Sequence, residues 1–235
     1  MPNRTICLIN DSFPPVTDGV ANAVVNYARV ITESGSTAVV ATPAYPGADD
    51  SALGFPVVRY PSIDMTKLVG YHAGFPFSEK TMKTLMEYPF DLIHCHCPIT
   101  SAVLARELRS RIHVPTVFTY HTKFDIDIAK AVRGKTLQDA AVKLLVSNIS
   151  ACDEVWVVSR GAGENLRSLG YAGDYIVMPN GVDFARGRVI YNDELRARYA
   201  KEKPYRDWIA EETLTVDALD EPVAAAPAED AEVSA

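Results

Sequence analysis

The chain is organised around the stretch Thr116–Phe124, TVFTYHTKF, which is typical of a buried strand that ends at a histidine. The residues TVFTY are β-branched or aromatic, and Pro115 marks the entry since proline donates no ladder hydrogen bond. His121 then follows the carboxyl end of this strand. In open α/β sheets the ligand crevice lies just outside such ends, so His121 is a candidate site residue; a half-buried packing histidine is the alternative.

Six further apolar runs of this kind alternate with segments of helical periodicity. This rhythm predicts an α/β domain with a doubly wound, mostly parallel, Rossmann-like sheet of about seven strands. The other strands are expected at 5–10, 37–42, 56–60, 91–95, 154–158 and 175–178, and the helices at 20–33, 78–87, 99–112, 124–151 with a break at Gly134, and 160–169. Residues 61–76 contain scattered aromatic side chains and receive no assignment.

Charge divides the chain into a neutral body and an acidic end. Eight of the 30 acidic residues follow Trp208, which leaves 22 acids against 23 bases before it. We therefore predict a folded domain over 1–190, a linker or helix over 191–208 and an acidic, disordered tail over 209–235. No basic patch of the kind that nucleic-acid binders carry is present, so nucleic acid is not an expected partner.

The cysteines and the first ten residues indicate the cellular compartment. Four cysteines lie in or beside apolar runs without the spacing of a disulfide framework, and the run in 1–10 is too short for a secretory signal. We expect a cytoplasmic protein with free thiols. Contact with the inner face of a membrane stays open, because 123–143 is the most basic local stretch; a solvated helix face is its alternative.

Asp18 and Gly19 precede the first expected helix, after the turn-rich segment DSFPPVTDG. A glycine at a helix start can bring bare backbone close to an anion, where N–H groups and the helix dipole favour negative charge. The alternative is that Asp18 caps the helix and Gly19 only eases the turn. No GxGxxG is present, so a dinucleotide site is not supported.

His94-Cys95-His96-Cys97 contains two kinds of metal ligand. Alternate residues of a strand point to opposite faces, so the four side chains cannot converge on one ion, and structural zinc sites use wider spacings. We expect no metal here. His96 is expected to face the crevice, with one histidine and one cysteine buried.

Together, five segments resemble the amino-terminal domain of the retaining glycosyltransferases of family 4, whose two-domain architecture is called GT-B. The matching segments, in the family's order, are DSFPPVTDGVANAV (11–24), DLIHCHCP (91–98), TYHT (119–122), VWVVS (155–159) and PNGVD (179–183). The resemblance implies one half of a GT-B fold, a nucleotide-sugar donor as substrate, a sugar or lipid acceptor, and no cofactor or metal.

The same resemblance implies roles for individual residues. It assigns the donor diphosphate to the backbone at Gly19, with Asp18 and Val20 as neighbours, and the transferred sugar to His121 as catalytic residue. The remaining cleft residues that it implies are His96, Tyr120, Thr122, Asn180 and Asp183. TYHT also resembles forms found in transferases that glycosylate lipids.

The chain departs from the family after PNGVD. The family continues with a donor-binding domain of roughly 150–200 residues, which carries an Arg/Lys pair for the diphosphate and a glutamate motif for the nucleotide sugar. Neither follows here. Three alternatives stay open: a truncated product, one half of a split enzyme with a separate donor-domain chain, or a non-catalytic acceptor-binding or regulatory module.

Overall fold

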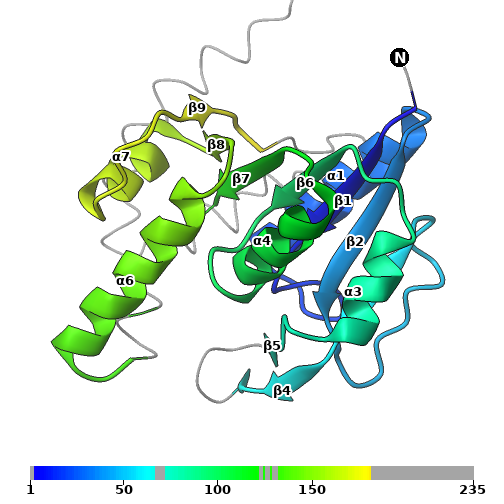
Figure 1. The fold of residues 1–235 in the computed structure, drawn as a ribbon, viewed down its shortest axis with the longest axis horizontal. Coiled ribbons are helices and arrows are strands. Elements are labelled where there is room, and N and C mark those ends of the chain that lie inside the picture. The colour runs from blue at the N-terminus through cyan, green and yellow to red at the C-terminus, as the bar shows by residue number, and fades with distance from the viewer. Residues whose placement is uncertain (1–2, 67–71, 122–123, 125–127, 129–131, 181–235) are drawn as a thin grey trace, which may run out of the picture. The chain divides into compact units, whose positions relative to one another are not determined.

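The computed structural model describes residues 3–66, 72–121, 124, 128 and 132–180, and the fold below is that of the compact unit Met1–Val182 (Figure 1). Its elements in chain order are β1 (Thr5–Ile9), α1 (Gly19–Glu33), β2 (Thr37–Pro43), β3 (Val57–Tyr60), β4 (Ser62–Asp64), β5 (His72–Gly74), α3 (Glu79–Met86), β6 (Leu92–Cys95), α4 (Thr100–Ile112), β7 (Thr116–Tyr120), α6 (Lys135–Ser150), β8 (Glu154–Val157), α7 (Arg160–Ser168) and β9 (Ile176–Val177).

Seven strands form one sheet in the order β3-β2-β1-β6-β7-β8-β9, and every neighbouring pair is parallel. The chain therefore winds outward from β1 in one direction through β2 and β3, and in the other through β6 to β9. The predicted doubly wound sheet of about seven strands is confirmed. The order reverses between β1 and β6, and crevices for ligands form at such a point, outside the carboxyl ends of the strands.

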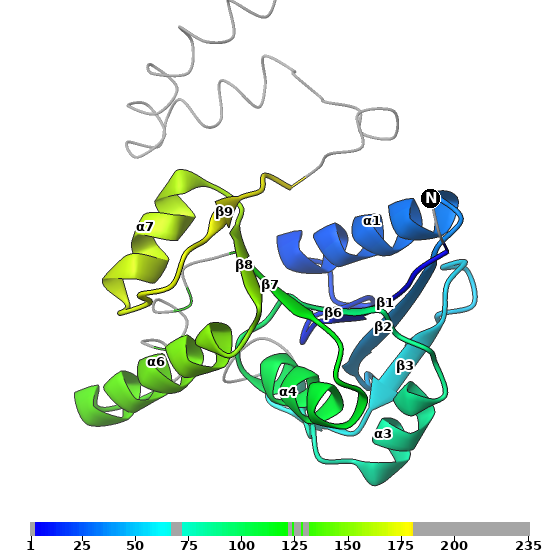
Figure 2. The same ribbon diagram turned by 45° about the horizontal axis from the view of Figure 1, so that its top comes forward.

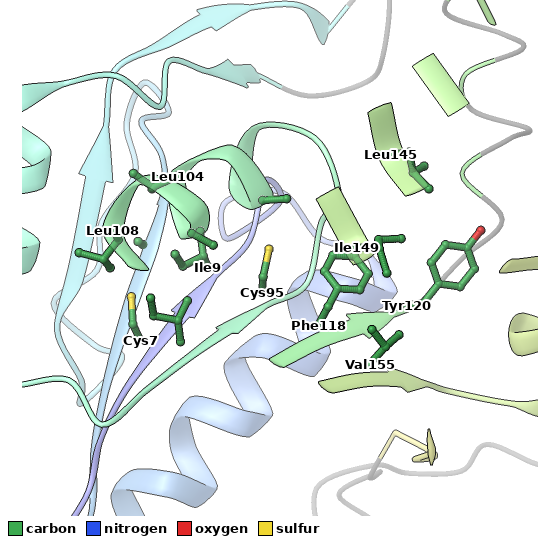
Figure 3. Close-up of a cluster of buried hydrophobic side chains, with 14 of the residues drawn as sticks. Cys7, Ile9, Cys95, Leu104, Leu108, Phe118, Tyr120, Leu145, Ile149 and Val155 are labelled. Atoms are coloured by element: carbon green, nitrogen blue, oxygen red, sulfur yellow. The ribbon is translucent and has the colours of Figure 1, made fainter. Parts of the chain in front are cut away.

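Helices cover both faces of the sheet, and the apolar side chains divide accordingly (Figure 2). On one face, α1 packs Val24 and Ala28 against Leu8 and Val40. The opposite face holds the larger cluster, in which α3, α4, α6 and α7 all bury side chains (Figure 3). Because side chains alternate along a strand, neighbours such as Cys7 and Leu8 belong to different clusters.

The helix ends follow the local sequence signals. Ser78 precedes α3, and its hydroxyl accepts the Thr81 N–H at 3.3 Å, as a capping serine does. Gly134, with φ of 94°, comes directly before α6, and Gly170, with φ of 102°, follows α7. The predicted break at Gly134 and stop at Gly170 are therefore confirmed, since a positive φ suits glycine.

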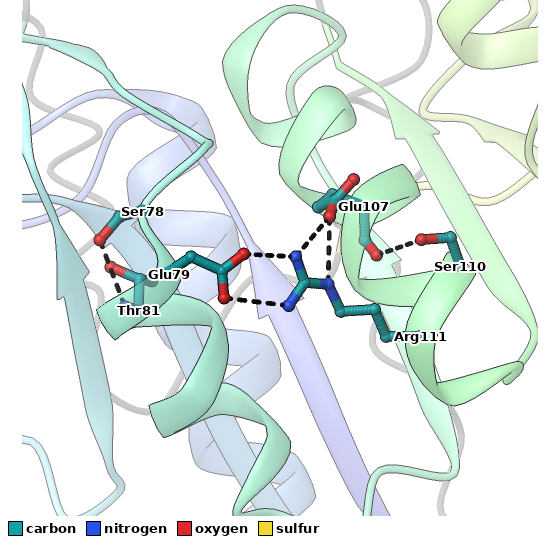
Figure 4. A network of polar contacts seen from close by, with 6 residues as sticks. All are labelled: Ser78, Glu79, Thr81, Glu107, Ser110 and Arg111. Atoms are coloured by element: carbon teal, nitrogen blue, oxygen red, sulfur yellow. Dashed lines mark hydrogen bonds and ion pairs between the residues drawn. The ribbon is translucent and has the colours of Figure 1, made fainter.

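A guanidinium ties α3 to α4 on the surface (Figure 4). Arg111 donates to Glu79 at 2.7 Å and to Glu107, four residues earlier on its own helix, at 2.8 Å. Solvent-exposed ion pairs of this kind contribute little to stability. They link α3 to α4, whose first turn lies near the carboxyl ends of the strands.

Two parts of the prediction need comment. The unassigned residues 61–76 contain the short antiparallel pair β4 and β5, in which Ser62 lies opposite Gly74. The predicted boundaries at 190 and 208, together with the predicted tail, lie outside the described residues. No helix within the described ranges is long and apolar enough to cross a bilayer.

Candidate functional site at the carboxyl ends of the strands

The candidate site lies where β1, β6 and β7 end, at the point where the strand order reverses. β1 is followed by Asn10 and Asp11, β6 by His96, and β7 by His121. The parallel registers bring these ends together, since Ile9 pairs with Cys95 and Cys95 with Phe118. Three polar segments that are far apart in sequence therefore meet at one edge of the sheet.

Asp11 joins the end of β1 to the start of α4. Its Oδ1 accepts the Ser101 N–H at 2.9 Å and the Ser101 hydroxyl at 2.6 Å, and the hydroxyls of Thr100 and Tyr60 also donate to it. Burial raises the pKa of this carboxyl, although the hydrogen bonds act in the opposite direction. Ile99 supplies no side-chain cap to α4. Asp11, from another segment of the chain, accepts the Ser101 N–H in its place.

Arg59 holds the loop between β1 and α1 in place. Its guanidinium donates twice to Asp50, at 2.7 and 2.8 Å, and also to the carbonyls of Pro14 and Pro43 at 2.6 and 3.1 Å. Phe13 lies under the same guanidinium, 5.9 Å from it. A planar fork of donors can make these bonds at once, and it anchors the loop that leads to Gly19.

The first turn of α1 is capped by Asp18. Its Oδ1 accepts the N–H groups of Val20 and Ala21, both at 2.8 Å, and the Ser12 hydroxyl donates to its other oxygen. The geometry is thus that of the capping alternative. Gly19 is exposed, and a Cβ built on it would meet no atom within 4 Å. The fold itself therefore does not require glycine at this position.

His94 in β6 and His96 just after it point to the α1 face of the sheet, and Cys95 points to the other. His94 Nε2 lies 2.7 Å from Thr119 Oγ1, and its ring meets those of Tyr27 and Trp156 edge-on. Within the described ranges no three His, Cys, Asp or Glu side chains are grouped as a metal site would need. The predicted alternation is observed, since His94 contacts Tyr27 of α1 while Cys95 lies in the core cluster on the opposite face.

His96 and His121 are joined ring to ring. His96 Nδ1 lies 2.9 Å from His121 Nε2, and the second nitrogen of His121, Nδ1, lies 3.3 Å from Asn180 Nδ2. The ring of His94 packs on that of His96, with 4.1 Å between centroids. The site thus contains a row of three rings that runs from the sheet interior to the exposed Asn180.

Burial keeps these rings neutral near pH 7. It lowers the pKa of His121 to about 4, against a smaller opposing effect of the Asp18 carboxylate. Burial also lowers the pKa of His94 to about 3, and that of His96 well below its usual range. A neutral imidazole carries one N–H and one bare nitrogen, so each ring can donate a hydrogen bond at one nitrogen and accept one at the other.

Two of the predicted cleft residues lie elsewhere. His96 was expected to face the crevice, but it is fully buried behind His121 and Tyr27, so it acts on the site only through its neighbours. Tyr120 was expected beside His121 in the cleft. Its ring instead lies in the large core cluster, and its hydroxyl donates to Asn165 at 2.7 Å (Figure 3). The reason is the strand alternation, which turns Tyr120 toward the α6 and α7 face.

The other predicted positions divide as follows. His121, Asn180 and Asp18 come together, through the hydrogen bond of His121 to Asn180 and its electrostatic interaction with Asp18. Thr122 and Asp183 lie outside the described residues. Asp11 and Tyr27 were missed as site residues; an acid directly after the first buried strand of an α/β sheet was the available signal for Asp11.

The sequence profile of Glycosyltransferase Family 4 matches residues 17–186 of this chain. The match covers α1, the strand ends that carry the histidines, and Asn180. It therefore includes the helix start and the ring pair described above.

Curated proteins that are similar in sequence to this chain include two with sugar-transferase or glycolipid-synthase names. A GDP-mannose-dependent alpha-mannosyltransferase of Corynebacterium glutamicum is 26% identical over 120 residues, which are 50% of this chain and 29% of that protein. An alpha-monoglucosyldiacylglycerol synthase of Streptococcus pneumoniae is 20% identical over 182 residues, 77% of this chain and 41% of that protein. The chain spans less than half the length of the curated relatives that it matches.

Among solved structures, a glycosyltransferase from Rickettsia africae aligns with a TM-score of 0.49 and 13% identity, covering 86% of this chain and 51% of that one.

Proposed function

The chain belongs to glycosyltransferase family 4, and from that premise we propose that it is the acceptor-side half of a hexosyltransferase that uses a nucleotide sugar and retains configuration. The observation that carries the proposal is the placement of His121. It follows β7 at the ligand edge of the sheet, it interacts electrostatically with Asp18 beside the exposed Gly19, and it is neutral. These are the positions where the resemblance puts the transferred sugar and the diphosphate.

The chemistry of sugar transfer suits a neutral ring at this place. Negative charge develops on the leaving diphosphate, and positive charge develops at the anomeric carbon. A cationic imidazole would oppose the second of these, whereas a neutral one can orient a sugar hydroxyl without repelling that carbon. The lowered pKa of His121, about 4, keeps it in this form at physiological pH.

Gly19 supports the diphosphate assignment because neither its backbone conformation nor its packing requires a glycine. Gly19 is not among the described glycines that have a positive φ, and a Cβ added to it would point into open space. What a side chain would obstruct is the approach of a ligand to the backbone at the helix start, where the dipole favours an anion. We therefore assign the donor diphosphate to this turn.

A donor-binding domain completes the proposed enzyme, either in the same polypeptide or as a separate chain. The relatives are more than twice as long as the part of them that this chain matches. We propose that the groups which grip the diphosphate and the nucleotide come from that domain, and that the reaction needs no metal. Without that domain, the 235-residue chain should be a poor catalyst, because it lacks part of the electrostatic stabilisation.

A non-catalytic acceptor-binding or regulatory half is the second candidate, and one observation favours it. The Asp18 carboxylate takes the N–H groups of Val20 and Ala21, which are among the donors that a helix start would offer to a diphosphate. A diphosphate at this turn would meet a negative group already in place. Sugar transfer by the assembled pair, and not binding alone, therefore separates the two candidates.

We further propose a lipid acceptor and contact with a membrane surface. α6 exposes Leu137 and Leu144, at 63% and 52%, which lie two turns apart on one face, and it carries the exposed Lys135 and Lys143. An apolar stripe with nearby lysines suits anionic headgroups. The pneumococcal relative, whose name contains diacylglycerol, supports a lipid as acceptor.

The test combines binding and transfer. Calorimetric titration of the chain with nucleotide sugars is followed by a transfer assay with and without a donor-domain chain taken from a full-length family 4 relative. We expect transfer only with the donor domain present, and its loss in His121→Ala. Turnover by this chain alone would contradict the proposed incompleteness. If the pair binds nucleotide sugar and acceptor but never transfers, the non-catalytic candidate is the correct one.

A further inference from the structure

The contact between His96 and His121 imposes a choice of proton positions. Their facing nitrogens, His96 Nδ1 and His121 Nε2, are 2.9 Å apart, a hydrogen-bond distance. Each neutral imidazole has one N–H and one bare nitrogen, so exactly one of the two facing nitrogens can carry the shared proton. The choice made there also determines what each ring presents at its other nitrogen.

Two arrangements satisfy the contact. In the first, His121 Nε2–H donates to His96 Nδ1, so that His121 Nδ1 is bare and His96 carries its proton on Nε2. In the second, His96 Nδ1–H donates to His121 Nε2, so that His121 has its proton on Nδ1 and His96 Nε2 is bare. The two arrangements therefore give the cleft opposite groups at His121 Nδ1, an acceptor or a donor.

The buried end of the pair distinguishes them. His96 Nε2 is buried, and within the described part of the chain it has no hydrogen-bond partner. In proteins a buried N–H without an acceptor is rarer than an acceptor without a donor, as backbone groups show. The second arrangement, which leaves His96 Nε2 bare, is therefore the favoured one.

The exposed end can adapt to that arrangement. Asn180 is exposed, and its side-chain Nδ2 lies 3.3 Å from His121 Nδ1. A half-turn of the amide brings its carbonyl oxygen to the same place, where it accepts an N–H. Asn180 thus follows the proton of His121 and does not set it, because an exposed amide can exchange its partners for water.

We propose that His96 is a positioning residue which keeps the ring proton of His121 on Nδ1, so that the ring offers a hydrogen-bond donor to the cleft. The ligand group that such a donor fits is an oxygen acceptor, such as a sugar hydroxyl, in exchange for Asn180. This inference deepens the proposed function and rests on it for the identity of the ligand. The proton position itself is independent of any transfer.

The test is a nitrogen–proton NMR experiment on the full 235-residue chain labelled with ¹⁵N in its histidine rings. Long-range ¹H–¹⁵N correlations distinguish a protonated ring nitrogen from a bare one. His121→Gln identifies the signals of His121 among those of the five histidines. We expect the proton on Nδ1 near pH 7, in the absence of nucleotide sugar; a proton on Nε2 in the unmodified chain overturns the proposal.

Two variants locate the cause. His96→Phe removes the donor but keeps a ring, so it should weaken the preference for Nδ1 and raise the share of His121 with its proton on Nε2, the form that free histidine prefers in water. Asn180→Ala should leave the proton on Nδ1. If Asn180→Ala raises the share on Nε2, or His96→Phe does not, the positioning role of His96 is wrong. His113→Asn, at an exposed helix end away from the pair, is the matched control and should leave the signals of His121 unchanged.

The unmodified chain alone decides the proton position if His96→Phe does not fold, and circular dichroism identifies that case. The NMR measurement uses no nucleotide sugar, no acceptor substrate and no turnover. A failure of sugar transfer therefore does not change its result. A proton on Nδ1 together with no nucleotide-sugar binding would retain the positioning role and reject the proposed function.

Discussion

The Asp11 carboxylate accepts both the N–H and the hydroxyl of Ser101, at 2.9 and 2.6 Å, across 90 positions of sequence. Asp11 follows β1 and Ser101 lies in the first turn of α4, so the bond spans the point where the strand order reverses. It supplies a cap that α4 lacks locally, and it joins the loop after β1 to the first turn of α4.

Asp11→Ala should destabilise the fold by about 1–3 kcal/mol, because it leaves the buried donors of Ser101 and Tyr60 without their acceptor. Asp11→Asn should cost clearly less, since every contact described for Asp11 is made by one oxygen, Oδ1, which an amide retains. Urea unfolding followed by circular dichroism measures both. Equal losses in the two variants would mean that the charge matters and the contacts do not.

Stability should fall as the pH drops from about 6.5 toward 4. The unfolded chain protonates each histidine below its ordinary pKa of about 6.5, whereas burial lowers the pKa of His121 to about 4 and that of His94 to about 3. Their contribution is therefore complete above pH 6.5 and is lost on acidification, at up to about 1.4 kcal/mol per pH unit for each ring. The raised pKa of Asp11 acts in the opposite direction.

Denaturant unfolding at a series of pH values measures this dependence. His121→Gln should reduce its slope by the contribution of one proton, because the glutamine does not titrate. A stability that stays constant between pH 6.5 and 5 would rule out the neutral, buried rings.

Gly19→Ala should leave the unfolding free energy unchanged or raise it by up to about 1 kcal/mol, since alanine is the better helix former and the added Cβ meets open space. Binding of a nucleotide sugar to the assembled enzyme should nevertheless weaken. Gly161→Ala, in the first turn of α7, is the matched control, because its Cβ also has room. Thermal melts and calorimetric titration report the two effects, and unchanged binding in Gly19→Ala would remove this turn from the diphosphate site.

Replacing both Lys135 and Lys143 by alanine should weaken binding to anionic phospholipid vesicles. A basic side chain near such a surface contributes about 1 kcal/mol, so the loss should be about 30-fold. Lys80→Ala with Lys83→Ala, two exposed lysines of α3, removes the same charge and should have little effect. Vesicle co-sedimentation compares the pairs; equal losses would mean that net charge, and not α6, determines the contact.

The strands and most helix ends were predictable because they depend on local chemistry. Apolar runs such as TVFTY, capping residues such as Ser78 and glycines such as Gly134 act within a few residues of themselves. The short pair β4 and β5 was not predictable, since its three-residue strands show too little periodicity for a pattern to appear.

The candidate site was predictable in position but not in detail. The end of the TVFTY strand placed His121 correctly at the carboxyl end of β7, whereas His96 and Tyr120 were expected in the cleft and are buried. A strand pattern says that neighbours point to opposite faces, but not what covers each face. Here Tyr27 and His121 cover His96, and the core beneath α6 and α7 takes Tyr120.

By itself the sequence determined a doubly wound parallel sheet, a histidine at the end of one strand and a glycine at the start of the first helix, because hydrophobic periodicity and turn chemistry are local. Only the tertiary structure decided that the rings of His96 and His121 are hydrogen-bonded to each other and that Asp11 caps α4. Those contacts join segments that are close in space and distant along the chain, and their energies depend on burial, which no local pattern contains.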